Sequence, residues 1–366
     1  MKSLYVHEGI NYMIVDECDQ KTVWASDGAY HSKFDRKTGF FARWGQNFED
    51  DPLWCPIGPE ILDLEISVNG CPNNCRFCYK GNTNAPAENM TFETFKAIFD
   101  KMPKTLTQIA FGITGVQTNP DFFRMMEYCR EHGVVPNFTM SGIDLTPELA
   151  DRIAKLAGAV AVSVYQTDKN VGYDAIKMLT DRGMKQVNIH LFTSEETLGF
   201  VKEVVEDRMS DPRLEQMRAI VLLGVKPKGR AKGRYTTLSQ DKFCKLVKDC
   251  LGKNIPIGFD SCSAPKFEQF VNTDTTLSDK EREAYRMACE SCESGLFSSY
   301  INQKGEFFPC SFCEGEAGWE TGLSVLTADS FLDVWHGSKV QDWRGQLLAS
   351  SCNGCRRCMA FPEINV

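Results

Sequence analysis

Residues 67–83 read SVNGCPNNCRFCYKGNT and bring three cysteines, Cys71, Cys75 and Cys78, into one turn-rich loop. The glycine, proline and asparagine residues between them permit tight turns. Disulfide pairing would leave one of the three thiols over, and a structural zinc site would need a fourth protein ligand. The spacing also allows the loop to wrap an iron–sulfur cubane and bind three of its four irons. The fourth iron would then be open to a small molecule that carries an amine and a carboxylate.

The composition is that of a soluble protein with many thiols. Of 366 residues, 42% are hydrophobic and 25% charged, which is ordinary for a globular chain. No apolar run approaches the roughly 20 residues of a membrane helix, and the first residues do not resemble a signal peptide. We therefore expect a cytoplasmic protein without membrane contact. It has 16 cysteines, and we expect the clustered ones to be metal ligands rather than disulfides. The net charge of −8 does not favour nucleic acid as a partner, without excluding it.

Strand-like and helix-like segments alternate from about residue 61 to residue 258, and the loop follows the first strand. Strands are predicted at 60–68, 106–114, 134–142, 159–167, 185–193 and 218–226, with a further edge strand at 255–262. Amphipathic helices are predicted at 91–103, 119–133, 146–158, 171–183, 194–209 and 239–252. Such alternation builds a parallel sheet with helices outside. Six units are fewer than the eight of a closed barrel, so the sequence predicts an α/β fold with a partial (β/α)6 barrel over residues 61–258.

Two further segments flank the predicted barrel. Residues 1–60 are expected to form a small β-rich segment, in which FDRKTGFFARWG reads as a hairpin with its turn at Lys37–Gly39. Residues 259–366 lose helical periodicity and gain cysteines. In parallel sheets the chemistry gathers at the carboxyl ends of the strands. The three-cysteine loop comes directly after the first of them.

The motif CPNNCRFC, with Phe77 before its last cysteine, resembles the C-x3-C-x2-C motif of the radical S-adenosylmethionine (radical SAM) superfamily. The resemblance extends over residues 60–260 in layout. It implies a 4Fe–4S cluster on Cys71, Cys75 and Cys78, with S-adenosyl-L-methionine (SAM) on the open iron. It also implies an electron donor such as flavodoxin or ferredoxin and cleavage of SAM to a 5′-deoxyadenosyl radical. A zinc loop or unrelated thiols are the alternative.

The same resemblance suggests the rest of a SAM pocket. The family's Gly-Gly-Glu-Pro-like turn corresponds best to Gly115–Gln117, where the acidic residue is missing. His190 also fits a buried core histidine whose ring nitrogens are hydrogen-bonded within the protein. Leu223 also fits an ordinary core leucine. The cofactor-binding candidates are Phe77, Gly115, Gln117, Ser141, Ser163, His190 and Leu223.

The C-terminal cysteines resemble the SPASM domain, or its shorter twitch relative, that follows many radical SAM cores. Three segments show this resemblance: a C-x12-G-x4-C run from Cys292 to Cys310, the hairpin-like YINQKGEFFPC and the helix-like SFLDVWHGSKVQDWR. The resemblance implies one auxiliary 4Fe–4S cluster on Cys292, Cys310 and two of the last three cysteines. If more of the thiols are ligands, it implies two clusters. A zinc ribbon is the alternative to both. The candidate ligands are Cys262, Cys289, Cys292, Cys310, Cys313, Cys352, Cys355 and Cys358.

Two other features allow simpler interpretations. The basic run KPKGRAKGR, residues 226–234, reads as a solvated loop, or as a contact for substrate phosphates. The remaining cysteines look isolated and read as buried apolar thiols: Cys18, Cys55, Cys129, Cys244 and Cys250.

Three functions fit these features. The first is a radical SAM maturase that abstracts hydrogen from a peptide or protein side chain, leading to oxidation, a crosslink or epimerisation. The second is a radical SAM enzyme that oxidises or rearranges a small molecule, nucleoside or nucleic-acid base. The third is a non-catalytic iron–sulfur or zinc protein. The sequence identifies no catalytic side chain, substrate or oligomeric state.

Overall fold

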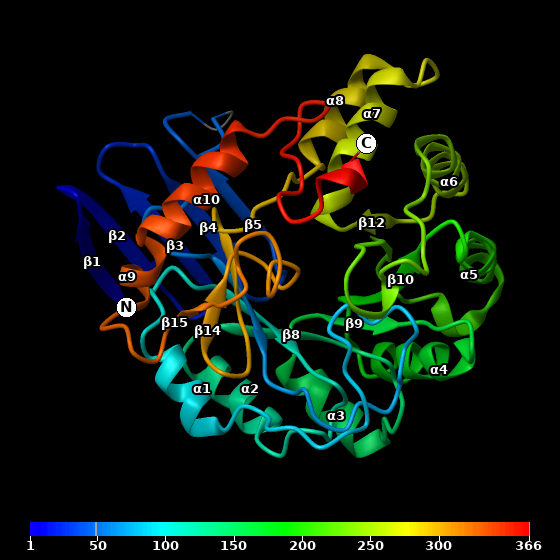
Figure 1. The fold of residues 1–366 in the computed structure, drawn as a ribbon, viewed down its shortest axis with the longest axis horizontal. Helices are drawn as coiled ribbons and strands as arrows, with labels where there is room; N and C mark the ends of the chain where they lie inside the picture. Colours follow the sequence, from blue (N-terminus) through cyan, green and yellow to red (C-terminus); the bar gives the residue numbers. More distant parts are fainter. Residues whose placement is uncertain (48–49, 366) are drawn as a thin grey trace.

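The computed structural model describes residues 1–47 and 50–365, which contain two large sheets (Figure 1). The N-terminal sheet is antiparallel with its strands in sequence order. Its strands are β1 (Lys2–His7), β2 (Ile10–Asp16), β3 (Gln20–Ala25), β4 (His31–Asp35) and β5 (Phe41–Trp44). The predicted hairpin is confirmed, because β4 pairs with β5 and the Asp35 carboxylate accepts hydrogen bonds from Lys37 N (3.0 Å) and Thr38 N (2.8 Å) in the turn.

One face of the N-terminal sheet is buried against the C-terminal part of the chain. Tyr12, Ile14 and Val23 alternate with exposed neighbours and share a core with Phe297 and Leu347. Leu347 lies on α10 (Ser338–Ala349), which crosses this sheet in Figure 1. The N-terminal segment is therefore packed against residues that are distant in sequence.

The second sheet contains the predicted partial barrel. Seven parallel strands pair in sequence order: β6 (Ile61–Glu65), β7 (Gln108–Gly112), β8 (Val135–Met140), β9 (Val160–Ser163), β10 (Val187–Thr193), β11 (Ile220–Gly224) and β12 (Ile257–Phe259). The predicted edge strand is thus confirmed as β12. The helices between them are α1 (Phe92–Phe99), α2 (Phe122–Glu131), α3 (Pro147–Leu156), α4 (Lys169–Thr180), α5 (Leu198–Ser210) and α6 (Gln240–Gly252).

The alternation of side chains along each strand separates an outer from an inner face. In β10, Ile189 and Leu191 are fully buried in the main apolar core, whereas His190 and Phe192 between them are only partly buried. Since the helices cover the outer face, the second set points into the barrel. This alternation places polar residues of several strands around one interior.

Three C-terminal strands extend the same sheet beyond β6. The strand β13 (Ser298–Ile301) pairs in parallel with β6, and β14 (Glu306–Phe308) and β15 (Leu323–Ser324) follow antiparallel. Gly305 has φ +79° in the β13–β14 turn, so the predicted glycine-turn hairpin is confirmed. Its attachment to the barrel edge was not predicted.

The C-terminal part contains more helix than its sequence pattern suggested. It includes α7 (Ala264–Thr273), α8 (Asp279–Met287), α9 (Phe331–Trp335) and α10. The helix α8 has no buried residue, and its start is fixed by a capping box at Ser278 and Glu281 instead. The predicted helix-like segment SFLDVWHGSKVQDWR contains α9 and part of α10, whereas α7 and α8 were not predicted, because apolar periodicity fades after residue 259.

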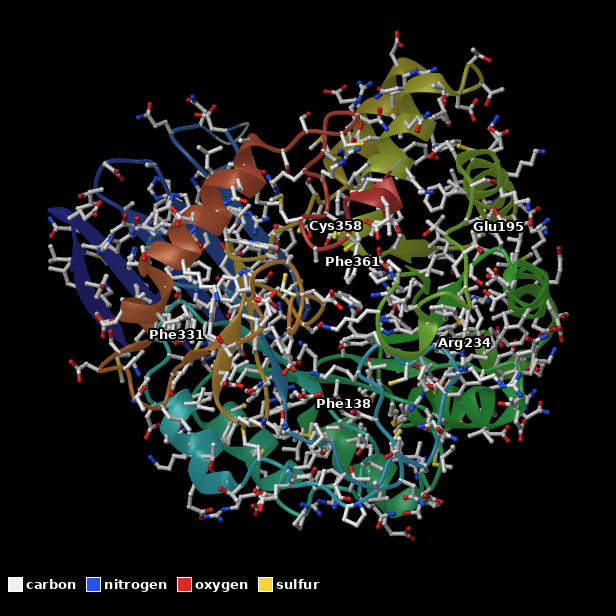
Figure 2. The ribbon with its side chains drawn as sticks, viewed as in Figure 1. Phe138, Glu195, Arg234, Phe331, Cys358 and Phe361 are labelled. Carbon is white, nitrogen blue, oxygen red and sulfur yellow. The ribbon has the colours of Figure 1, made fainter. Side chains whose placement is uncertain are left out.

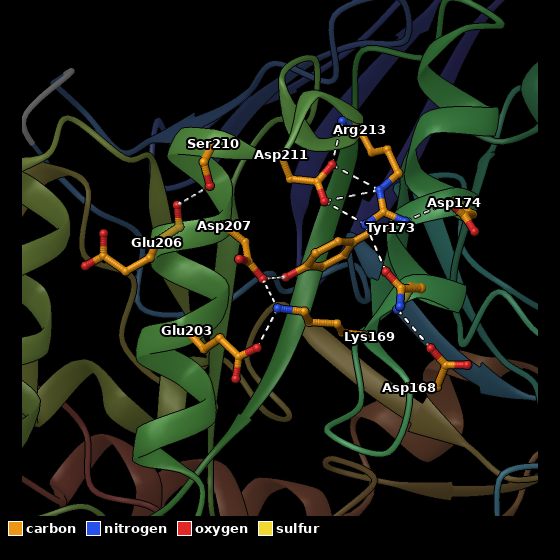
Figure 3. Close-up of polar contacts among 11 residues, drawn as sticks. Asp168, Lys169, Tyr173, Asp174, Glu203, Glu206, Asp207, Ser210, Asp211 and Arg213 are labelled. Carbon is orange, nitrogen blue, oxygen red and sulfur yellow. Dashed lines mark hydrogen bonds and ion pairs between the residues drawn. The ribbon is translucent and has the colours of Figure 1, made fainter.

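Charged side chains fix the helices on the outer side of the barrel (Figure 3). The Tyr173 hydroxyl on α4 donates to Asp207 on α5 (2.7 Å), and Lys169 binds the same carboxylate (2.5 Å). Arg213, in the short helix η1 (Pro212–Leu214), binds Asp174 (2.9 Å). These contacts connect neighbouring helices to one another, so we assign this network a structural role.

Candidate metal centres

The three-cysteine loop lies after β6 at the carboxyl ends of the barrel strands, and neighbouring side chains fix its start. The side-chain oxygen of Asn89 accepts hydrogen bonds from Val68 N (2.9 Å) and Asn69 N (3.1 Å). The Thr114 hydroxyl, in the loop after β7, donates to the Asn69 carbonyl (2.7 Å). The entry to the loop is thereby tied to the second strand of the barrel.

The three thiols of the loop are free and partly shielded from water. Cys71 is buried, and Cys75 and Cys78 are half-buried. Asn74 adopts φ +44° between them. The thiolates of Cys71 and Cys78 would both repel that of Cys75, although burial is the main cause of its raised pKa. The thiols are thus close enough to interact, and we call them the N-terminal thiol set.

The distances between ligand atoms differ from one kind of metal centre to another. Zinc binds sulfur at about 2.3 Å, which brings sulfurs on one ion within about 4 Å of one another. In the described part of the chain, one group of three or more metal-binding side chains has all its ligand atoms within 4.8 Å, and it does not include this set. Three thiols from one loop fit an iron–sulfur cluster, where each thiolate binds a different iron.

The segment after β11 holds the loop from the other side. Within the short helix η2 (Gly229–Ala231), Arg230 Nε donates to the Cys75 carbonyl (2.7 Å), and its Nη1 donates to the carbonyls of Gly81 (3.1 Å) and Asn82 (2.9 Å). The backbone N–H of Arg230 donates to the Cys78 carbonyl (3.0 Å). Arg230 therefore fixes the part of the loop from Cys75 to Asn82.

Several predicted pocket residues do lie on the inner face of the barrel near this loop. His190 pairs in register with Ser163, and Phe192 with Leu223, on adjacent strands. The ring of Phe77 stacks on that of Phe192, with centroids 4.2 Å apart. Burial lowers the pKa of His190 to about 4, so its imidazole is neutral at pH 7.

The other predicted residues follow β7 and β8. Ser141 is buried at the end of β8. A Cβ on Gly115 would lie 4.0 Å from Pro72 of the thiol loop, so this turn is adjacent to the loop. Gln117 is exposed.

The sequence analysis missed Tyr165 and a group of carboxylates. The Tyr165 hydroxyl lies within hydrogen-bonding reach of the Cys75 thiol and of Ser163. It could have been found, because Tyr165 follows Ser163 by two residues and shares its face. Asp63, on β6, has its carboxylate exposed to water, yet surrounding protein raises its pKa to about 6 by desolvation.

A second network connects the loop to the C-terminal hairpin. Lys80 Nζ lies 2.6 Å from the Tyr300 hydroxyl and 3.1 Å from Glu65, and it also pairs with Glu314. The Tyr300 hydroxyl donates to Glu65 (3.0 Å). Burial raises the pKa of Glu65, whereas at Glu314 burial is outweighed by the Lys80 charge, so that pKa is lowered. The loop and the C-terminal hairpin therefore share a buried ion network.

Five of the C-terminal cysteines gather near the end of β12. The sulfurs of Cys310 and Cys313 are 3.3 Å apart. Cys262 lies within hydrogen-bonding reach of Cys358, and the charge of its thiolate acts on both Cys292 and Cys310. Cys358 is drawn in Figure 2, beside Phe361 of the same apolar cluster. We call these five residues the C-terminal thiol set.

A smaller group lies apart from that set. The ligand atoms of Glu268, Cys289 and Cys355 all lie within 4.8 Å of one another. Cys352 differs again, because its sulfur contacts the backbone carbonyl of Asn365 (3.2 Å). Of the last three cysteines, Cys355 thus lies beside Cys289, and Cys358 beside Cys262, while Asn365 contacts both Cys352 and Cys358.

The remaining thiols and the basic run need correction. Cys55, Cys129 and Cys250 are buried as expected, but Cys18 is exposed in the turn after β2. In the basic run, Lys226 and Lys228 are buried, so the solvated-loop interpretation was wrong for them. Their partners are protein groups: Asp260 for Lys226 (2.5 Å) and the Phe312 carbonyl for Lys228 (3.0 Å). Lys232 and Arg234 (Figure 2) are exposed.

Comparison with family models and curated proteins gives two matches to families. Residues 66–228 match the model of the radical SAM superfamily, and residues 289–359 match the SPASM iron–sulfur cluster-binding domain. No curated protein matches the chain. Within residues 1–47 and 50–365, every helix is too short or too polar to cross a lipid bilayer.

Solved structures share the fold at low sequence identity. SuiB of Streptococcus suis bound to the precursor peptide SuiA is 11% identical with a TM-score of 0.67, covering 97% of this chain and 94% of that one. SuiB bound to S-adenosylmethionine is 13% identical with a TM-score of 0.60, covering 80% and 68%. Native anSMEcpe with bound AdoMet and the Cp18Cys peptide is 14% identical with a TM-score of 0.57, covering 78% and 82%.

Proposed function

The chain belongs to the radical SAM superfamily and carries a C-terminal SPASM domain, and we propose that it modifies a peptide or protein side chain by abstracting a hydrogen atom. The observation that carries the proposal is the N-terminal thiol set, held on both sides at the carboxyl ends of the barrel strands. The two domains imply 4Fe–4S clusters and SAM as cofactors. When bound together, they supply a 5′-deoxyadenosyl radical after an electron arrives from a donor such as flavodoxin or ferredoxin.

The residues around the N-terminal thiol set suit this chemistry. Three thiolates can bind three irons and leave the fourth open. Arg230 fixes the backbone of the loop through the Cys75, Gly81 and Asn82 carbonyls. The stacked rings of Phe77 and Phe192 place apolar surface beside the thiols, which shields a reactive radical from water.

The C-terminal cysteines support two auxiliary centres rather than one. We assign the first to the C-terminal thiol set, whose five sulfurs exceed the four that a cubane needs. We assign the second to Cys289 and Cys355, with Glu268 as an oxygen ligand, because these ligand atoms are close enough for a shared metal. An auxiliary cluster can accept the electron that remains after hydrogen abstraction.

The shared fold supports a peptide as the substrate. The likeness to SuiB extends over 97% of this chain, and SuiB was solved with a precursor peptide. The inner carboxylate of Asp63 and the net charge of −8 favour a basic or neutral peptide over a polyanion. The phosphate-binding interpretation of the basic run also loses support, since Lys226, Lys228 and Arg230 bind protein groups.

The test uses anaerobic reconstitution of the full chain with iron and sulfide. We expect the wild type to convert SAM to 5′-deoxyadenosine in the presence of a reductant. Cys75→Ala should abolish this cleavage and lower the iron content by roughly four per chain, while the C-terminal signals remain. Cys18→Ala is the matched control, because this thiol is exposed and isolated; its cleavage and iron content should equal those of the wild type.

Peptide modification is tested by expressing the chain with candidate precursor peptides and measuring their masses. A mass change or a new crosslink that requires Cys75 supports a peptide substrate. Cleavage of SAM by Cys75→Ala, or zinc without iron in the wild type, would overturn the proposed function. Cleavage that only small molecules stimulate would overturn the peptide assignment alone.

A further inference from the structure

One short segment, Lys226–Arg230, lies between the N-terminal and the C-terminal thiol sets. It follows β11 and carries three cationic side chains in five residues. Two of them, Lys226 and Lys228, are 4% and 9% exposed. Buried cations are costly unless they are paired, so their partners indicate what the segment does.

The Arg230 end of the segment contacts the N-terminal thiol set. Its guanidinium donates to the Cys75 carbonyl (2.7 Å), and its charge acts on the Cys75 thiol. The Nη2 atom of Arg230 is buried and has no hydrogen-bond partner. A buried N–H group without a partner is rare, and here it belongs to a cation beside three thiols.

The Lys226 end contacts the C-terminal thiol set. Its ammonium group pairs with Asp260 (2.5 Å) and lies 5.0 Å from the centre of the Phe312 ring. The thiolates of Cys262 and Cys358 both act on its charge. Lys226 therefore places a second buried cation at the other group of sulfurs.

The middle of the segment attaches to both sides. Lys228 Nζ donates to the carbonyls of Phe312 (3.0 Å) and Glu314, in the loop that carries Cys313. The backbone of Gly229 touches that of the thiol loop, because an added Cβ would lie 2.5 Å from the Cys78 carbonyl oxygen. The segment is in direct contact with both cysteine-bearing loops.

We propose that Lys226–Arg230 is a cationic bridge that fixes the two thiol sets relative to each other and favours the reduced form of the iron–sulfur cluster at each end. The proposal rests on the proposed function, because it takes both sets to hold clusters. Reduction adds a negative charge to a cluster, and a fixed cation nearby stabilises that charge most where water is excluded. Arg230 serves the N-terminal cluster and Lys226 the C-terminal one.

The experiment is a redox titration followed by electron paramagnetic resonance, on full-length protein reconstituted without oxygen. The signal that is missing in Cys75→Ala identifies the N-terminal cluster. We expect Arg230→Gln to lower the reduced-to-oxidised ratio of this cluster at least tenfold at a fixed potential, about 59 mV for one electron. Lys226→Gln should do the same to the C-terminal cluster, with the N-terminal cluster within twofold of the wild type.

Two further variants separate charge from position. Lys232→Gln removes an exposed charge from the adjoining residues and should change neither ratio by more than twofold. Arg230→Lys keeps the charge but loses the hydrogen bonds that the guanidinium donates to three backbone carbonyls. It should restore the ratio of the N-terminal cluster to within about threefold of the wild type. In hydrogen–deuterium exchange of the metal-free protein, residues 71–83 should exchange faster in both Arg230 variants than in Lys232→Gln.

The outcomes distinguish the bridge from the proposed function. The role of the Arg230 charge would be overturned if the N-terminal cluster had the same reduced-to-oxidised ratio in wild type and Arg230→Gln. It would also be overturned if this ratio were as low in Arg230→Lys as in Arg230→Gln. Unchanged exchange at residues 71–83 would overturn the positional role, and this measurement remains decisive if Arg230→Gln takes up no iron. A wild type without any iron–sulfur signal would instead contradict the proposed function.

Discussion

Replacing Gly229 by alanine tests how tightly the cationic bridge fits the three-cysteine loop. An added Cβ would lie 2.4 Å from the Tyr79 carbonyl oxygen and 2.5 Å from that of Cys78. Both are backbone atoms, so the two segments would have to separate by roughly half an ångström, and overpacking of this kind costs about 1–3 kcal/mol. Gly229 also has φ +58°, a conformation that costs alanine roughly 1–2 kcal/mol.

Gly233 provides a matched control for this substitution. It lies four residues further on with φ +70°, and nothing lies within 4 Å of an added Cβ. Gly233→Ala should therefore lose only the conformational part, roughly 1–2 kcal/mol. The difference between the two variants, about 1–3 kcal/mol, isolates the contact with the thiol loop.

Urea unfolding of the metal-free protein measures this difference, and the iron content after anaerobic reconstitution measures its consequence. We expect Gly229→Ala to unfold at lower urea than Gly233→Ala and to lose the iron of the N-terminal thiol set. Gly233→Ala should bind as much iron as the wild type. Identical unfolding curves and identical iron contents for the two variants would refute the close fit described for this segment.

Two other substitutions test charges that the surrounding protein desolvates. The Glu60 carboxylate lies 2.8 Å from Arg43 Nη1 and is 2% exposed. Arg43→Met leaves this carboxylate without its cation and should lower the free energy of unfolding, measured with urea, by about 3–5 kcal/mol. The control Lys37→Met breaks a pair whose lysine is 72% exposed and should cost less than about 1 kcal/mol in the same assay. Asp63→Asn should be more stable than the wild type at pH 7.5, with a difference that shrinks toward pH 4. The sign follows because the folded Asp63 has its pKa raised to about 6 from 3.8, so the wild type loses stability as pH rises through this interval. Equal stability of the two proteins at pH 7.5 would contradict the desolvation of Asp63.

Local patterns were enough to predict the barrel and its thiol loop. The strands and helices between residues 61 and 258 follow from periodicity within each segment, and the Cys71–Cys78 spacing is a local property of one loop. Ser163 and His190, which the family resemblance suggested for one pocket, are register partners on the adjacent strands β9 and β10.

Features that depend on distant contacts were not predictable in this way. The burial of Lys228 depends on carbonyls 84 and 86 residues away, so the basic run looked solvated. Cys355 and Cys358 are three residues apart, yet Cys355 lies beside Cys289 and Cys358 beside Cys262. Their partners come from two separate segments, Cys262 from the residues after β12 and Cys289 from those after α8, which no local spacing encodes.

The pairing of β13 with β6 has a consequence during protein synthesis. The first barrel strand emerges early from the ribosome, but its neighbour on that side comes much later, as the Tyr300–Glu65 hydrogen bond between residues 235 positions apart illustrates. At 5–20 residues per second the wait is roughly 10–50 s. Throughout this time β6 has an open edge of unpaired backbone groups, a template for pairing with other chains. Translation speed and chaperones that cover exposed strands should therefore affect how much of this protein reaches its folded form.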